Sequence, residues 1–215
     1  MLFDAAGTLI HLPRGVGFHY AEVAQRHGVA CDEKALNRAF ATAWQSMPSR
    51  TNNGRPRDDD DRGWWRQLVD QTLDTVNAPP FDRDAYFEEL YSEFTRPGVW
   101  DLFPEVPRVL EILAPRFTLG IVSNFDARLR VILRQFGLLS RFKEIILSSE
   151  MGVDKPDRAI FTTAIERLGL GPEEVCYVGD DPKLDWEAAE RVGLRVFRLD
   201  RRVNDLTMLV DWLGV

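Results

Sequence analysis

The chain has 215 residues, of which 45% are hydrophobic and 28% charged, with 13 Phe and 6 Trp. This composition is typical of a well-packed protein and excludes a disordered or collagen-like chain. No apolar run approaches the roughly 20 residues of a membrane-spanning helix, so we expect no membrane partner. The net charge of -7 argues against nucleic acid as a partner, because a polyphosphate backbone requires a basic surface.

The N-terminus and the cysteines predict a cytoplasmic protein. Asp4 interrupts the N-terminus before the apolar stretch of a signal peptide could form. Cys31 and Cys176 lie far apart and form no metal-binding motif, which fits a reduced compartment. Only Leu2 and Phe3 precede Asp4 as a strand, whereas a buried strand usually runs about 5–6 residues. Either this strand is short or the sequence begins late, and the residues leave both open.

Residues 12–100 carry helical patterns and no strand pattern. We expect amphipathic helices at residues 16–27, 32–47, 63–76 and 82–94. Residues 48–62 read as a polar loop, and we interpret its acidic run, residues 58–61, as solvated. The pair Trp64 and Trp65 is interpreted as core of this helical block.

From residue 104 onward, helical and strand patterns alternate. Helices are expected at 104–115, 127–136, 157–168, 184–192 and from 204, and strands at 117–122, 144–147, 175–178 and 195–199. This alternation predicts right-handed βαβ units and a parallel sheet. We therefore predict an α/β fold: a Rossmann-like parallel sheet core with helices on both faces, formed by residues 1–11 and 101–215. An all-helical cap domain, residues 12–100, is inserted into it.

Polar residues follow four of the expected strands. They are Asp4, the pair Ser123 and Asn124, Lys155, and the group Asp180, Asp181 and Asp185. The carboxyl ends of parallel strands share one edge of the sheet, where such folds bind ligands. Clustered carboxylates repel one another unless a cation lies among them, and hard oxygen ligands select Mg²⁺. A carboxylate there can attack phosphorus and form an aspartyl phosphate, while a hydroxyl, an amide and an ammonium donate to the phosphoryl oxygens.

On these motifs the chain resembles the haloacid dehalogenase superfamily, in the subfamily whose helical cap follows the first strand. The resemblance covers nearly the whole chain, and its four ordered motifs are Asp4-Ala-Ala-Gly-Thr-Leu9, Ser123-Asn124, Lys155 and the GDxxxxD form from Gly179 to Asp185. It implies that Asp4 is the nucleophile, that Thr8 and Ser123 hold the phosphoryl group, that Lys155 pairs with that group and with Asp4, and that Asn124 orients the site. It also implies that Mg²⁺ is bound by Asp4, the Ala6 backbone carbonyl, Asp180, and Asp181 or Asp185 directly or through water.

Ala6 departs from this pattern. Most phosphatases of the superfamily carry a second Asp at this position as general acid and base. Such assistance is typically worth about 10²–10⁴-fold, so its loss should matter. Metal binding need not suffer, because a backbone carbonyl is the ligand there. His11 and His19 are alternative proton donors, although an exposed or capping role is more usual for such histidines.

Other activities stay open. Dehalogenases of the superfamily also lack the second Asp, but they need no metal and carry a neutral fourth motif, unlike Asp180 and Asp185. Phosphonatases share the pattern Asp-x-Ala-Gly-Thr but need a cap lysine, and the only one here, Lys34, is expected on the exposed side of a helix. A relative that merely binds a phosphorylated ligand is supported by Ala6 and weakened by the otherwise intact site.

The prediction is a Mg²⁺-dependent phosphatase that acts on a small phosphorylated metabolite. A closing cap excludes bulky polymers, which favours a small substrate. Phosphonatase-like or dehalogenase-like hydrolysis is the alternative, together with a weakened binding relative. The sequence does not name the substrate or the oligomeric state.

Overall fold

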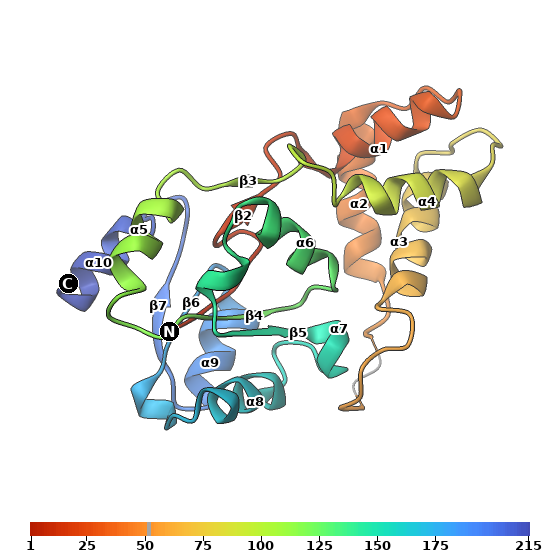
Figure 1. The fold of residues 1–215 in the computed structure, drawn as a ribbon. Helices are drawn as coiled ribbons and strands as arrows, with labels where there is room; N and C mark the ends of the chain where they lie inside the picture. Colours follow the sequence, from red (N-terminus) through yellow and green to blue (C-terminus); the bar gives the residue numbers. More distant parts are fainter. Residues whose placement is uncertain (51–52) are drawn as a thin grey trace. The chain divides into compact units, whose positions relative to one another are not determined.

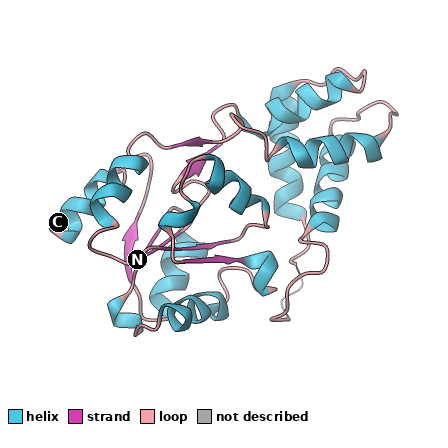
Figure 2. Ribbon diagram, viewed as in Figure 1, coloured by secondary structure: helices cyan, strands magenta, loops and turns pink. Residues whose placement is uncertain are grey.

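A computed structural model gives the fold and describes residues 1–50 and 53–215. The chain forms two compact units. The core unit contains Met1–His11, Leu102–Val215 and a segment described from Asn53 to Asp60. The helical unit contains Leu12–Arg50 and Asp61–Asp101. Figure 1 labels the helices and strands of both units, and Figure 2 colours the chain by secondary structure.

A five-stranded parallel sheet in the order β5-β4-β1-β6-β7 forms the centre of the core unit. Its strands are β1 (Leu2–Phe3), β4 (Gly120–Ser123), β5 (Glu144–Leu147), β6 (Cys176–Gly179) and β7 (Arg195–Arg198). Although β1 has only two residues, it is the middle strand: Phe3 pairs with Ile121 on one side and Val178 on the other. The short apolar segment before Asp4 is therefore held by strands on both sides.

Helices cover both faces of this sheet. They are α5 (Val106–Leu113), α6 (Arg128–Gln135), α7 (Ser148–Met151), α8 (Arg158–Leu168), α9 (Glu187–Arg191) and α10 (Thr207–Leu213). Apolar residues of α8 and α9 pack against Leu2, Val122 and Tyr177 of the sheet. On the other face lie α5, α6 and α10 (Figure 1). This confirms the predicted α/β class. Two short strands, β2 (Ile10–His11) and β3 (Asp101–Leu102), form a separate sheet.

Four helices form the helical unit: α1 (Gly15–Arg26), α2 (Glu33–Ser46), α3 (Arg62–Thr75) and α4 (Arg83–Glu93). Their apolar faces share one core, which includes Tyr20, Leu36 and Leu73. Side chains of Asp32 and Asp82 cap α2 and α4 by accepting backbone N–H bonds in the first turn. The elements described between β2 and β3 are all helices, and the domain bounds 12–100 stay a prediction. None of the described helices combines the length and the hydropathy that a bilayer crossing requires.

The solvated loop predicted for residues 58–61 is wrong for Asp60 and Asp61. Asp60 Oδ2 accepts a hydrogen bond from Ala127 N at 3.0 Å, and its Oδ1 accepts one from Ser149 Oγ. Asp61 is only 4% exposed and lies 3.5 Å from the Arg50 guanidinium. Each carboxylate therefore meets its own donor, which offsets the repulsion expected along the acidic run.

Most element boundaries differ from prediction by one to three residues, and two of the differences bear on the site. The strand predicted at 117–122 begins at Gly120, because Arg116 and Phe117 still donate their N–H groups to Leu113 O after α5. The helix predicted at 184–192 is divided into a π-helical turn, Pro182–Trp186, and the short α9. That turn decides which acidic residues meet at the sheet edge.

Candidate active site

Asp4 stands at the carboxyl end of the central strand. Its N–H donates to Val178 O at 2.9 Å, which continues the pairing of β1 with β6 and fixes the start of the following loop. In that loop the N–H groups of residues 8–10 all donate to Ala5 O. Gly7 adopts φ +89°, and a Cβ there would lie 2.4 Å from Asp180 Oδ2. Only glycine allows this turn to come so close to the carboxylate.

Lys155 connects two carboxylates at this edge. Its buried Nζ lies 2.7 Å from Asp4 Oδ1, 2.6 Å from Asp185 Oδ1 and 3.1 Å from the Tyr177 hydroxyl. Burial alone would lower the pKa of Lys155, but Asp4 and Asp185 together raise it above its ordinary value. The two carboxylates therefore favour the charged form of the lysine.

The carboxylates carry more negative charge than Lys155 balances. Burial raises the pKa of Asp4 to about 6; Lys155 opposes this shift, and Asp185 and Asp180 add to it. Burial likewise raises the pKa of Asp180, whose Oδ1 accepts a hydrogen bond from Thr8 Oγ1 at 3.0 Å. A further cation at this edge would offset the cost of keeping these groups ionised.

Asp4, Asp180 and Asp185 together fit a divalent metal ion. Each offers one oxygen, and these oxygens lie within 4.8 Å of one another. An all-oxygen donor set suits a hard cation such as Mg²⁺. Asp181 has a different place: its Oδ1 accepts hydrogen bonds from Lys183 N and Leu184 N, both at 2.8 Å, and caps the π-helical turn.

The predicted residues of the second motif also reach this edge. Asn124 Oδ1 accepts from Lys155 N at 2.6 Å, and its Nδ2 donates to Lys155 O at 2.9 Å. Asn124 therefore clamps the backbone that carries the lysine. Ser123 ends β4 and is buried, and its hydroxyl forms no hydrogen bond with another residue that the structure describes.

Comparison with known proteins identifies the family. A family model described as haloacid dehalogenase-like hydrolase matches residues 1–193. The chain belongs to the haloacid dehalogenase-like hydrolase family. Haloacid dehalogenase-like hydrolase domain-containing protein 3 from Danio rerio is 34% identical to it over 212 residues, which cover 97% of this chain and 88% of that protein. The resemblance seen in the motifs is confirmed, and the protein is a hydrolase.

Solved structures share the fold of this HAD-like hydrolase. The HAD phosphatase from Thermococcus onnurineus has a TM-score of 0.68 at 23% identity, over 99% of this chain and 96% of that chain. The L-2-haloacid dehalogenase from Xanthobacter autotrophicus has a TM-score of 0.71 at 22% identity, over 99% and 81%. At such identities the likeness shows the fold alone, so the chemistry has to be argued from this chain's own residues.

Two residues of the site escaped the sequence analysis. Tyr177 lies in the middle of β6, with its hydroxyl 2.8 Å from Asp185 Oδ1. A hydroxyl in an otherwise apolar buried strand was the available signal. Arg201 donates to the carbonyl oxygens of Gly7 and Thr8 and so supports the loop after Asp4. Nothing in the sequence indicated this contact, because Arg201 lies far along the chain.

Of the two histidines and the cap lysine, His19 is buried, His11 is half-buried and Lys34 is exposed. His11 stacks on Phe103 with 4.5 Å between ring centroids. His19 is 3% exposed, with Nδ1 3.6 Å from Glu93 Oε1, so the exposed or capping role expected for it is wrong. Burial lowers the pKa of His19. Lys34 is exposed on α2, as predicted.

Proposed function

We propose that this HAD-like hydrolase is a Mg²⁺-dependent phosphatase that acts on a small phosphorylated metabolite through an aspartyl phosphate on Asp4. The observation that supports it is the cluster of Asp4, Asp180 and Asp185 around Lys155. Three carboxylates against one ammonium leave a negative charge for a metal to balance. A metal held there would offset the repulsion between these carboxylates and an approaching phosphate group.

In the proposed first step, an oxygen of Asp4 attacks phosphorus while the bond from phosphorus to the leaving oxygen breaks. Water then attacks the same phosphorus, the bond to Asp4 breaks, and inorganic phosphate leaves. Lys155, 2.7 Å from Asp4 Oδ1, orients the carboxylate and stays positively charged throughout. Ser123 holds the phosphoryl group, and Asn124 positions the lysine. The hydroxyl proton of Thr8 is donated to Asp180 instead, so Thr8 keeps that carboxylate in place.

Mg²⁺ would be held by Asp4, the Ala6 carbonyl, Asp180 and Asp185, and would supply positive charge opposite the phosphoryl oxygens. Tyr177 hydrogen-bonds to Asp185 and so keeps one of these carboxylates in place.

Ala6 sets the expected range of substrates. With no carboxyl group at this position, the leaving oxygen lacks its usual proton donor, so we expect a preference for good leaving groups such as aryl and acyl phosphates. For substrates with poorer leaving groups, the proton would come from a water, from a residue of the helical unit or from the substrate itself. Ala6→Asp should raise kcat/KM for an alkyl phosphate by about 10²-fold or more and change that for an aryl phosphate little. Equal gains on both substrates would contradict this explanation.

The alternative hydrolases have less support. Dehalogenases of the superfamily carry a neutral fourth motif, whereas this chain has an acidic cluster there. A phosphonatase needs a cap lysine in the active site, whereas Lys34 is exposed on α2.

The deciding experiment measures phosphate release from 4-nitrophenyl phosphate and acetyl phosphate, with Mg²⁺ and with chelator. We expect metal-dependent release that falls by about 10⁴-fold or more in Asp4→Asn. Matching circular dichroism and melting curves would show that the variant is folded. No release by the folded, Mg²⁺-supplied protein would refute the phosphatase, and 2-haloacids and phosphonates would be tested next. Failure on all of them would favour the binding relative.

A further inference from the structure

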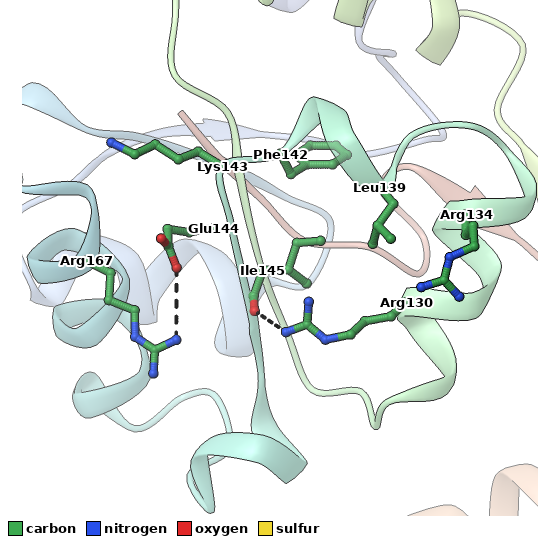
Figure 3. A pocket seen from close by; sticks show the side chains of 8 residues that line it. All are labelled: Arg130, Arg134, Leu139, Phe142, Lys143, Glu144, Ile145 and Arg167. Carbon is green, nitrogen blue, oxygen red and sulfur yellow. Dashed lines mark hydrogen bonds and ion pairs between the residues drawn. The ribbon is translucent and has the colours of Figure 1, made fainter.

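A hollow of about 360 Å³ opens on the core unit, at the side of the sheet formed by the edge strand β5 (Figure 3). It is lined by residues of α6, α8, the amino end of β5 and the segment before that strand. The catalytic residues follow the carboxyl ends of the strands, and the length of β5, at about 3.3 Å per residue, separates the two places. The hollow is therefore not part of the proposed active site.

Positive charge dominates the lining. Four cationic side chains (Arg130, Arg134, Lys143 and Arg167) line it together with one carboxylate, Glu144, and a second carboxylate, Glu150, pairs with Arg130 from outside the lining. This excess stands out in a chain whose net charge is -7. Arg167 lies 4.0 Å from Glu144 Oε2. The side chains of Arg134 and Lys143 form no ion pair or hydrogen bond with any residue that the structure describes, so their charges are available to a ligand.

One of the cations is already held in position. Arg130 Nε and Nη2 donate to the two carboxylate oxygens of Glu150 at 2.8 and 2.7 Å, and Nη2 also donates to Ile145 O at 3.0 Å. Arg134 lies one turn further along α6, so the two side chains leave the same face of that helix. A side chain fixed in this way loses little conformational entropy when a ligand binds.

Apolar side chains lie between the charged groups. Figure 3 shows Leu139, Phe142 and Ile145 between the pair Arg130 and Arg134 on one side and Lys143 and Arg167 on the other. Phe142 and Ile145 are mostly buried, so their positions are fixed by packing and only a small part of each side chain reaches the hollow. The volume lies at the lower end of the range for small-molecule sites, about 300–1,000 Å³, which suits one ring or a short chain.

We propose that this hollow is a second binding site, which takes a small organic anion with an apolar body. Its acidic group binds beside Arg134 and Arg130, and its apolar body lies on Leu139, Phe142 and Ile145. The two free cations attract the anion, and the apolar surface selects organic anions over inorganic ones. This proposal does not depend on the phosphatase activity.

The test is a titration of the full-length, Mg²⁺-supplied protein with 3-phenylpropionate, followed by amide NMR. We expect saturable shifts at residues 139–145. Arg134→Gln should weaken binding by about tenfold or more, since a hydrogen bond to a charged group is lost. The matched control is Arg141→Gln, which removes the same charge from an exposed position outside the lining and should leave the affinity unchanged. The neutral analogue 3-phenylpropanol should bind much more weakly.

Three results would overturn the proposal. They are the absence of saturable shifts, an equal loss of affinity in Arg134→Gln and Arg141→Gln, and shifts confined to residues 4–8. The equal loss would mean that diffuse charge alone attracts the probe, and the last would place the probe at the catalytic edge. Because the readout is the position of bound probe, none of these outcomes depends on whether phosphate esters are hydrolysed.

Discussion

Two groups of buried charges in this protein differ in their balance. At the sheet edge, Lys155 is the one ammonium among Asp4, Asp180 and Asp185. In the helical unit, the buried Glu93 has Arg26 at 3.0 Å and Arg96 at 2.8 Å, so its charge is fully matched. A matched group is stabilised by the chain itself, whereas an excess of one sign is relieved by a ligand of the other sign or by protonation.

The pKa shifts follow the same division. Burial raises the pKa of Asp4 and is only partly opposed by Lys155. Burial would also raise the pKa of Glu93, but Arg96 and Arg26 outweigh it and lower that pKa below its ordinary value. Burial of a carboxylate therefore does not by itself indicate a site; the uncompensated carboxylate does. The following predictions test this comparison.

The largest effect is expected from removing the single cation of the edge. In the presence of chelator, Lys155→Met leaves the carboxylates unpaired and should lower the free energy of unfolding by about 3–5 kcal/mol. Urea denaturation measures it. Lys183→Met, at an exposed position on the neighbouring turn, should stay within about 0.5 kcal/mol of the original. Similar curves for the two variants would show that charge does not hold this edge together.

Metal binding should distinguish Asp180 from its neighbour Asp181. Mg²⁺ at a hundredfold excess over its Kd should stabilise the protein by about 2.7 kcal/mol, seen as a rise in Tm. Asp180→Asn should lose most of this rise. The matched variant Asp181→Asn should keep both the rise and the helix cap, since Asn caps as well as Asp. A loss of the rise in Asp181→Asn alone would make Asp181 the ligand.

In the helical unit, removing the charge of Glu93 should reduce stability without affecting metal binding. Glu93→Gln should lower the free energy of unfolding by about 1–3 kcal/mol, because two arginines lose a charged partner. The Mg²⁺-dependent rise in Tm should stay unchanged. Glu89→Gln is the control: this more exposed partner of Arg26 should cost about 1 kcal/mol or less. A change in the metal response would contradict the division between the two groups.

The smallest effect is a pH dependence from His19. Because burial lowers the pKa of His19, the unfolded chain takes up a proton more readily than the folded one. Its contribution to stability is therefore present above the ordinary His pKa of about 6.5 and decreases as the pH falls below it. His19→Gln should flatten the pH dependence of the unfolding free energy between about pH 7 and 5. Equal slopes in both proteins would exclude His19 as the source.

The sequence by itself determined the fold class and the sheet edge at which the candidate site residues meet. Alternating periodicities from residue 104 onward require a parallel sheet, and polar residues after each strand must meet at its carboxyl edge. The same local logic located Asp4, Ser123, Asn124, Lys155 and the acidic group 180–185. The spacing of apolar residues and the direction of the chain are properties of short segments. They can therefore be predicted without knowing what packs against each segment.

Only the tertiary structure decided how these residues divide their roles. The π-helical turn Pro182–Trp186 brings Asp185 into the cluster and uses Asp181 as a cap, although both lie in one acidic motif. The contact of Arg201 with the loop after Asp4 and the binding of Asp60 to Ser149 join segments far apart in the chain. Such contacts depend on how distant elements pack, and no local pattern of residues contains that information.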